Sequence, residues 1–239
     1  MRVAVQLTQR PKAVSANSFS SVWYVLIALP FVAMLAFAIF KPVLVLPRMD
    51  LAPGFNFVDQ NDAQLTNEDL RGRIVLYNFT YTACAAPCPE TGAVMRAVQD
   101  QLPAMNTQGL PVELVTLSFD PEHDSAEQLR AYAARFGAQA DRWHLATGDT
   151  TLLKYVIGGG FGVYYQATAT SDDAGAFTFD PAFVLVDGAG IVRAKYRTAT
   201  PDLAILQRDI ELVAKEAAES TGAARLVYEA AHLFVCYPK

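Results

Sequence analysis

The feature that most constrains this chain is a buried-strand pattern that leads, across two cysteines, into a helix pattern. The segment Ile74–Phe79 is apolar and β-prone, and Pro89–Leu102 has helical periodicity. A strand followed at once by a helix is typical of α/β domains. Cys84 and Cys88 would then lie at the helix N-terminus, where unpaired N–H groups and the helix dipole favour thiolate. Two converging thiols suit a reversible disulfide or a soft metal ion such as Cu(I).

Further strand and helix patterns alternate along the rest of the chain. We expect hairpins over 55–65 and 183–196, strands over 112–119 and 143–146 (the latter short or at a sheet edge), and helices over 125–136, over 149–157 and from Pro201 onward. Asp124 or Ser125 is the expected N-cap of the second helix, and the glycines at 158–160 should end the third. This order predicts one α/β domain with a mixed sheet and helices on both faces.

Near the N-terminus, Val22–Phe40 is a run of 19 residues without a charge and with one proline, Pro30. As a helix it would span roughly 28 Å, close to the hydrocarbon thickness of a bilayer. Arg2, Arg10 and Lys12 precede it, and no acidic residue occurs before Asp50. The sequence therefore predicts a single-pass transmembrane helix with a cytoplasmic N-terminus and the remaining domain on the periplasmic or extracytoplasmic side.

Two other interpretations of this run stay open: a cleaved signal peptide with Ala36–Ala38 as the cleavage site, and a buried helix of a cytosolic protein. The expected layout has five parts. These are a cytoplasmic N-terminus (1–21), a transmembrane anchor (22–40), a linker (41–53), the α/β domain (54–217) and a C-terminal tail (218–239).

Charge and cysteine content narrow the function classes. Five of the 19 Lys and Arg residues but none of the 24 acidic residues precede Asp50, so the remainder is strongly acidic. An acidic domain is a poor partner for nucleic acid or an anionic membrane surface. Three cysteines are too few for a disulfide-stapled scaffold, and a closely spaced pair outside the cytoplasm is more typical of redox or metal chemistry.

Several motifs are more specific than these patterns. They are Leu70-Arg-Gly-Arg73, Phe79-Thr-Tyr-Thr-x-Cys-x-x-x-Cys-Pro89, Ser118-Phe-Asp-Pro-Glu-x-Asp124, Trp143-x-Leu-x-Thr-Gly148 and Phe161-Gly-Val163. On these motifs the chain resembles the Sco/SenC proteins, membrane-tethered proteins involved in copper delivery to cytochrome c oxidase, over residues 50–215. The resemblance implies a thioredoxin-like mixed sheet flanked by helices. It also implies that Cys84 and Cys88 bind copper and cycle as a disulfide.

One position departs from the family pattern. Sco proteins carry a histidine copper ligand about eight residues before the last hairpin turn, and counting back from Asp187 reaches Phe179, which cannot bind a metal. A shifted alignment reaches Asp180, a hard oxygen donor that suits Cu(I) poorly. Pro181 stands where thioredoxin-like oxidoreductases have a cis-proline that faces the active-site cysteines. We expect Pro181 to face the substrate in this way, the alternative being a trans-proline that opens a strand.

The chain offers a few other metal-binding side chains. His123 lies in an acidic turn and is expected to be solvated, and His144 is expected to have no ligand role. His232 and Cys236 are four residues apart and would share a helix face, which could hold a metal or offer a third thiol. The simpler expectation is that both pack on a short terminal helix.

The sequence also suggests roles for two acidic and three aromatic residues. Asp120 and Asp124 could bind a metal or guide a partner, although a turn and helix-cap role explains them. The aromatic side chains of Phe161, Tyr164 and Tyr165 are expected in the core.

Three functions stay open. The first is a Sco-type metallochaperone for the copper centre (CuA) of cytochrome c oxidase, with Cu(I) on Cys84 and Cys88. The second is a thiol–disulfide oxidoreductase acting on the oxidase subunit or other exported proteins, in which Cys84 attacks, Cys88 resolves and Pro181 faces the substrate. The third is a non-catalytic subunit or assembly factor of a respiratory complex, docking through the stretch from Ala223. The implied partner is the copper-bearing oxidase subunit or another respiratory-complex subunit. A peroxiredoxin site is disfavoured because Tyr81 stands where its threonine would be.

Overall fold

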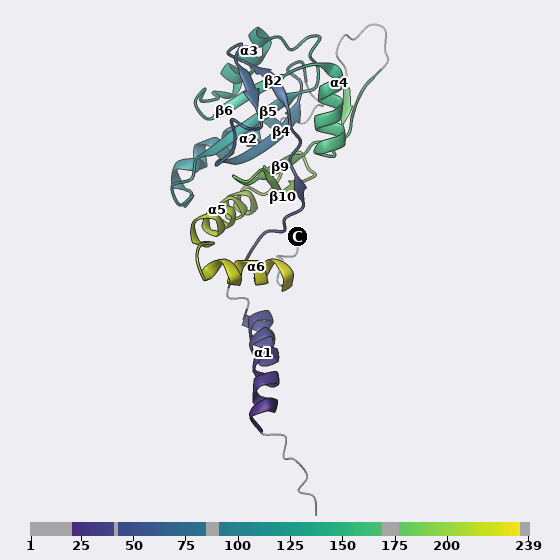
Figure 1. Cartoon of the computed structure of the whole chain (residues 1–239). Coiled ribbons are helices and arrows are strands. Elements are labelled where there is room, and N and C mark those ends of the chain that lie inside the picture. Colours follow the sequence, from purple (N-terminus) through teal and green to yellow (C-terminus); the bar gives the residue numbers. More distant parts are fainter. Residues whose placement is uncertain (1–20, 41–42, 85–90, 169–176, 235–239) are drawn as a thin grey trace, which may run out of the picture. The chain divides into compact units, whose positions relative to one another are not determined.

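The computed structural model describes residues 21–40, 43–84, 91–168 and 177–234 of the chain, which divides into two compact units, Met1–Pro42 and Val43–Lys239 (Figure 1). In the first unit, α1 (Ser21–Phe40) is a helix whose large apolar side chains are exposed, Leu29 and Phe31 among them. Counting the described residues alone, no helix combines the length and apolarity that crossing a membrane requires. The transmembrane anchor over 22–40 therefore stays a prediction.

The second unit is built on an eight-stranded mixed sheet with the strand order β1-β10-β9-β4-β5-β6-β2-β3. Its strands are β1 (Asp50–Leu51), β2 (Asn56–Asp59), β3 (Gln64–Thr66), β4 (Ile74–Thr80), β5 (Val112–Ser118), β6 (Trp143–Thr147), β9 (Phe183–Val186) and β10 (Ile191–Tyr196). The central strands β4, β5 and β6 are parallel, and β9 and β2 flank them in antiparallel pairing. Parallel strands need crossover helices, which the sequence supplies between them.

Successive residues of the fully buried β4 enter two different cores, because side chains alternate across a strand. Ile74 and Leu76 pack on one face with the helices α2 (Thr91–Gln101), α3 (Ala126–Phe136) and α5 (Leu203–Glu219). Tyr77 and Phe79 pack on the other face with α4 (Thr150–Leu153) and the π-helical segment η2 (Lys154–Gly160). In Figure 1, α2 and α4 accordingly lie on opposite sides of the strands. The predicted mixed sheet with helices on both faces is confirmed.

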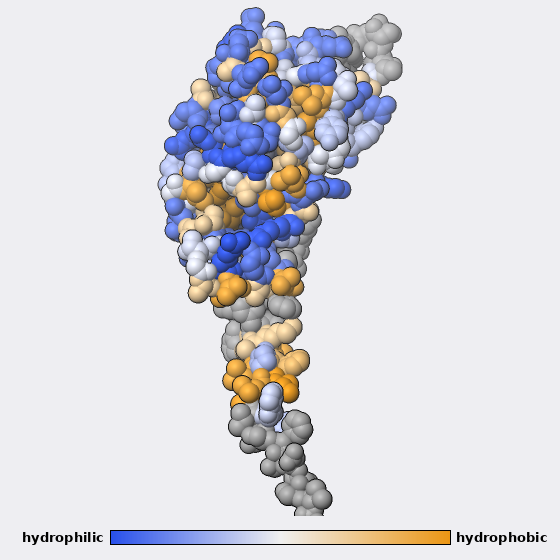
Figure 2. Space-filling model, in the orientation of Figure 1, coloured by the Kyte–Doolittle hydropathy of each residue, from blue (hydrophilic) through white to orange (hydrophobic). Residues whose placement is uncertain are grey.

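The remaining elements are a short 3₁₀ turn, a small hairpin and a last helix. They are η1 (Leu102–Ala104), β7 (Tyr165–Ala167), β8 (Phe177–Phe179) and α6 (Ala224–Phe234). The strands β7 and β8 form a separate two-stranded antiparallel sheet. Figure 2 shows mainly polar side chains over the visible face of the unit Val43–Lys239, in keeping with its acidic composition.

Several expectations need correction. The helix over 149–157 does not end at the glycines; it continues as η2 through Gly160, closed by a hydrogen bond from Phe161 N to Val156 O (2.9 Å). Only Gly160 excludes a side chain, because a Cβ added there would lie 2.5 Å from carbons of the Pro53 ring, whereas Gly158 and Gly159 face open space. The strand predicted over 143–146 is short, as one of the two alternatives stated, and it is not an edge, because β2 pairs beside it.

Helix α5 begins at Leu203 rather than at Pro201, because the Asp202 side chain caps it by accepting a hydrogen bond from Ala204 N (2.8 Å). Of the three aromatic residues expected in the core, Phe161 is buried. Tyr164, which precedes β7, is 51% exposed, and Tyr165, the first residue of β7, is half-buried with its ring stacked on that of Phe119.

Candidate functional site

Cys84 lies in the loop after β4, at the carboxyl end of the parallel strands, where ligands bind in open α/β sheets. Its backbone N–H donates to Tyr81 O (3.2 Å), and its half-buried side chain packs against the core that contains Tyr81. Cys84 is in a disulfide. The other two cysteines, Cys88 and Cys236, lie outside the described residues, so the geometry of the predicted pair stays a prediction.

The loop that carries Cys84 is held by a carboxylate from the turn between β5 and α3. Asp124 is fully buried and accepts hydrogen bonds from Thr82 Oγ1 (2.5 Å), Thr82 N (2.9 Å) and Ser118 Oγ. Burial raises the pKa of the Asp124 carboxyl, although these three donors oppose the rise. The N-cap predicted at Asp124 or Ser125 is Ser125, and Asp124 lies in the turn before it. The Asp124 carboxylate joins the cysteine loop to the end of β5.

Aromatic rings surround this loop on the same face of the sheet. The Tyr81 ring centroid lies 5.2 Å from that of Phe177 and 6.3 Å from that of Phe179, and the Phe119 centroid is 5.1 Å from both. Cys84 packs against the same apolar cluster. Phe179, which the sequence comparison predicted to replace the family's histidine, is therefore part of an aromatic wall, which we define as Tyr81, Phe119, Phe177 and Phe179.

Pro181 is half-buried and lies two residues before β9 begins at Phe183. Because β9 runs antiparallel to β4 with Phe183 opposite Asn78, Pro181 lies at the end of β4 that leads to Cys84. Asp180 is exposed, and its backbone N–H donates to Tyr164 O (3.0 Å). The structure thus brings Pro181 and Phe179 to the same end of the sheet as Cys84. The cis, substrate-facing role of Pro181 stays a prediction.

The donors available for a metal ion are few. Within the described ranges, no group of three or more His, Cys, Asp or Glu side chains could hold one. His144 lies between Asp59 (3.9 Å) and Glu113 (3.6 Å), away from the cysteine loop. His232 is 2.8 Å from Glu216 on α5 and mostly buried, as the packing expectation predicted. The part of the cysteine site that the structure describes therefore offers sulfur and aromatic rings, but no imidazole.

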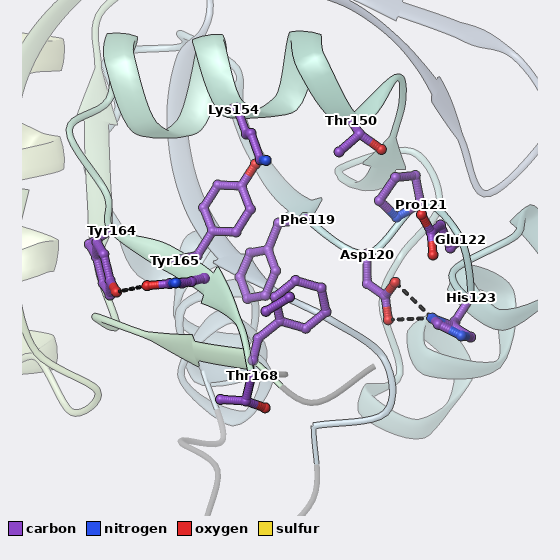
Figure 3. Close-up of a pocket in the computed structure, with 13 residues that line it drawn as sticks. Phe119, Asp120, Pro121, Glu122, His123, Thr150, Lys154, Tyr164, Tyr165 and Thr168 are labelled. Carbon is purple, nitrogen blue, oxygen red and sulfur yellow. Dashed lines mark hydrogen bonds and ion pairs between the residues drawn. The ribbon is translucent and has the colours of Figure 1, made fainter. Parts of the chain in front are cut away.

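His123 is exposed, as the sequence predicted for this acidic turn, and it pairs with a neighbouring carboxylate. Its Nδ1 lies 2.8 Å and 2.9 Å from the two carboxylate oxygens of Asp120, which is buried (Figure 3). The hydrogen bond and charge of Asp120 raise the pKa of His123. The pair lines a cavity of about 420 Å³ that also contacts Phe119, Lys154 and Tyr165. Burial raises the pKa of Tyr165 to about 12, so its phenol is neutral at physiological pH.

Sequence reasoning missed two parts of this site. The carboxylate link from Asp124 to Thr82 was hidden because the two residues are 42 positions apart, although both lie in the quoted motifs. The β7–β8 hairpin was missed because its strands have three residues each and a segment of eight residues outside the described ranges separates them. Only pairing with each other makes such short segments strands.

Comparison with curated proteins identifies relatives that match part of the chain. A protein from Stutzerimonas stutzeri named as copper-binding is 40% identical over 96 residues, covering 40% of this chain and 46% of the relative. The SCO1 protein homolog of Bacillus subtilis (strain 168) is 34% identical over 94 residues, covering 39% of this chain and 47% of the relative. The chain thus spans about half the length of these relatives.

Solved structures share the fold over a longer range. A SCO1/SenC family lipoprotein from Bacillus anthracis strain Ames has a TM-score of 0.61 and 25% identity, covering 70% of this chain and 96% of that one. BsSco, described as a Sco-family cytochrome c oxidase assembly protein with a disulfide switch, has a TM-score of 0.60 and 24% identity (70% and 95% covered). Arabidopsis thaliana ScoI, solved with copper bound, has a TM-score of 0.59 and 23% identity (70% and 98% covered).

These likenesses establish the thioredoxin-like fold. The SCO1/SenC family model matches residues 46–234, which is most of the chain. Sco-family proteins are involved in the copper assembly of cytochrome c oxidase, and homologues are described as copper-binding. With the motifs, the fold and the family match in agreement, the chain belongs to the SCO1/SenC family.

Proposed function

We propose that this protein supports assembly of the copper centre of cytochrome c oxidase by carrying Cu(I) on the thiolates of Cys84 and Cys88. The observation that carries the proposal is the position of Cys84 in a SCO1/SenC fold: it follows β4 at the carboxyl end of the parallel strands, in a loop pinned by Asp124. Copper is the cargo here, and the partner is the copper-bearing oxidase subunit.

The surroundings of Cys84 favour a low-coordinate sulfur site. Cu(I) is a soft ion that prefers thiolates, and two of them suffice to hold it. Phe179 supplies no donor, and the aromatic wall keeps water from one side of the cysteine loop. A site with two protein ligands leaves a coordination position for a donor of the receiving protein. That arrangement suits a carrier, because the partner's ligand enters before the carrier's thiolates leave.

We further propose that residues 22–40 anchor the protein in the cell membrane as a single pass, with the domain on the extracytoplasmic side. Within the described part of α1, large apolar side chains including Trp23, Leu29, Phe31 and Leu35 are more than half exposed, and the helix is orange in Figure 2. A helix that is apolar all round has no polar face to turn to water. The solved SCO1/SenC lipoprotein of Bacillus anthracis is a precedent for membrane attachment in the family.

An anaerobic Cu(I) titration of the reduced full chain in detergent tests the proposal. We expect one Cu(I) per chain, with an X-ray absorption spectrum that shows sulfur neighbours and no nitrogen. Cys84→Ser and Cys88→Ser should each abolish binding, whereas Cys236→Ser, the matched control, should leave it intact. Failure of the reduced wild-type chain to bind Cu(I) would overturn the cargo role and leave the oxidoreductase and the non-catalytic assembly role as explanations.

A second candidate, a thiol–disulfide oxidoreductase, is favoured by the disulfide at Cys84 and by the lack of an imidazole in the described site. The Cys84 thiolate would attack a target disulfide and form a mixed disulfide. Cys88 would then displace the target, which leaves with two thiols while Cys84 and Cys88 end oxidised, a transfer of two electrons.

The reduction potential of the full chain separates the two candidates. A potential near or above about −230 mV, measured in glutathione buffers, together with rapid exchange with a test disulfide, would favour the oxidoreductase. A potential below about −300 mV would identify a bond that resists reduction and would count against turnover.

A further inference from the structure

The carboxylate of Asp124 bonds to the loop that carries Cys84 and not to its own helix. Its described hydrogen bonds come from Thr82 Oγ1 (2.5 Å), Thr82 N (2.9 Å) and Ser118 Oγ. The turn around Asp124 is closed by backbone groups, with Asp124 N donating to Asp120 O (2.9 Å). Helix α3 is capped at Ser125. Neither the turn nor the helix therefore requires an acidic side chain at this position.

Thr82 is the residue through which this carboxylate reaches the cysteine. It follows Tyr81, which is buried in the aromatic wall. Thr82 is the second residue of the turn from Tyr81 to Cys84, in which Cys84 N donates to Tyr81 O (3.2 Å). Fixing both the backbone and the side chain of Thr82 fixes the start of that turn. A fully buried carboxylate accepting three hydrogen bonds is a stiff support, because releasing it would leave a buried charge unpaired.

We propose that Asp124 is a positioning residue that holds Cys84 half-buried against the aromatic wall by pinning Thr82, and so sets the reactivity of its thiol. The inference rests on the proposed function for its biological role, since Cys84 is the residue that would handle copper or exchange disulfides. The geometry that carries it, a carboxylate linking β5 to the loop after β4, does not depend on which of those two chemistries applies.

The chain offers a matched control in the same turn. Asp120 is also buried, and its carboxylate also accepts a strong hydrogen bond, but its partner is His123 rather than the cysteine loop. Replacing either aspartate by asparagine removes one buried charge from the same loop. Only the replacement of Asp124 removes the support from Thr82.

The test measures how fast the Cys84 thiol reacts. The full chain in detergent is reduced, freed of reductant without air and treated with iodoacetamide, so that the thiolate forms a carbon–sulfur bond and iodide leaves. Mass spectrometry of peptides gives the rate at Cys84 separately from the other cysteines. We expect Asp124→Asn to raise this rate about fivefold or more, within the range of couplings in one hydrogen-bond network. Thr82→Val should raise it less, since the backbone bond remains.

Three further variants make the outcome decisive. Thr82→Ser, which keeps the hydroxyl, and Asp120→Asn should stay within about twofold of wild type. The double variant Asp124→Asn/Thr82→Val should react no faster than Asp124→Asn alone, because both changes break the same link. A lower melting temperature in Asp124→Asn with an unchanged Cys84 rate would overturn the inference, as would an equal rise in Asp120→Asn.

The test stays decisive under two other complications. If Asp124→Asn fails to fold, Thr82→Val against Thr82→Ser decides the question, with circular dichroism confirming that both are folded. Failure of Cu(I) binding together with the expected alkylation pattern would refute the proposed cargo and not the positioning role. Intact Cu(I) binding with unchanged alkylation in every variant would refute the positioning role alone.

Discussion

Phe179 shows how one residue alters the ligands that the cysteine site can offer to a metal ion. It lies at the end of β8 with its ring 5.1 Å from Phe119, in the wall against which Cys84 packs. A phenyl ring offers apolar surface but no lone pair, so it can shield a bound soft ion without coordinating it. On the proposed function, this single side chain is the reason to expect coordination by sulfur alone.

Restoring an imidazole should therefore strengthen copper binding. Phe179→His should tighten Cu(I) binding about tenfold or more, equivalent to about 1.4 kcal/mol, because a nitrogen joins the two sulfurs. Phe177→His is the matched control, being half-buried in the same wall two residues earlier. Competition against a chromophoric Cu(I) chelator measures both affinities. Equal gains from both variants would mean that the position of Phe179 is not special.

His123 should titrate above its ordinary pKa of 6.5, because Asp120 stabilises its charged form through a hydrogen bond and by charge. A raised histidine pKa means that the pair contributes its stability below the ordinary value, and the contribution is lost as the pH rises through the raised one. Nuclear magnetic resonance titration of the imidazole checks this. In Asp120→Asn the midpoint should fall back toward 6.5. A wild-type midpoint at or below that value would contradict the assigned ion pair.

At the scale of elements, a buried arginine joins three segments that are distant in sequence. Arg193 on β10 is 2% exposed and donates to Asp187 Oδ2 (3.0 Å), Glu216 Oε2 on α5 (2.6 Å), Leu46 O (2.7 Å) and Pro47 O (3.2 Å). Buried polar groups of this kind are favourable only when every partner is in place. The cluster fixes the chain that enters the domain against the last hairpin and α5.

Breaking this cluster should destabilise the domain strongly. Arg193→Met should cost about 3–5 kcal/mol, because it leaves the Glu216 carboxylate buried without its main partner. The control is Arg142→Met, whose 3.8 Å pair with Asp141 lies at the surface and should contribute less than about 1 kcal/mol. Urea denaturation of both variants measures the difference. Similar losses in the two would show that the buried cluster has no special weight.

The same cluster predicts a pH dependence. Burial alone would raise the pKa of Glu216, but the hydrogen bond and charge of Arg193, together with His232, outweigh it and lower the pKa below its ordinary 4.5. A lowered carboxyl pKa contributes stability above the unfolded value, and this stability is lost as the pH falls through the folded value. The stability gap between wild type and Glu216→Gln should therefore shrink below about pH 4.5. A gap that is constant from pH 7 to pH 3 would contradict this.

At the scale of the whole molecule, the two units differ in how far their apolar side chains are buried. The described part of α1 exposes apolar side chains along its length, whereas the unit Val43–Lys239 buries its apolar residues in two cores on the faces of one sheet. An exposed apolar helix is more stable in an apolar environment, and an acidic domain with a buried core is more stable in water.

The full chain should accordingly partition with membranes. It should resist extraction by high salt and by alkaline carbonate and dissolve in detergent, while a variant lacking residues 22–40 should be recovered without detergent. Mass spectrometry of the mature N-terminus distinguishes the anchor from a cleaved signal peptide. A chain that begins after Ala38 would contradict the anchor.

The sequence alone determined the central strands, the helices that cross between them and the position of Cys84 at the end of β4. Apolar periodicity involves residues that are close in sequence, so it can be recognised without the structure. The family could be predicted too, because specific motifs identify it. The lack of an imidazole at position 179 is plain from the phenylalanine in the sequence.

Only the tertiary structure decided what surrounds Cys84 and which charges meet. The link from Asp124 to Thr82, the pairing of β7 with β8 and the meeting of Arg193 with Leu46 and Glu216 all join residues remote in sequence. Such contacts follow from how the sheet orders its strands. Whether a hydrogen bond forms depends on a few tenths of an ångström in the donor–acceptor distance. A pattern of residue types along the chain does not reveal distances at that precision.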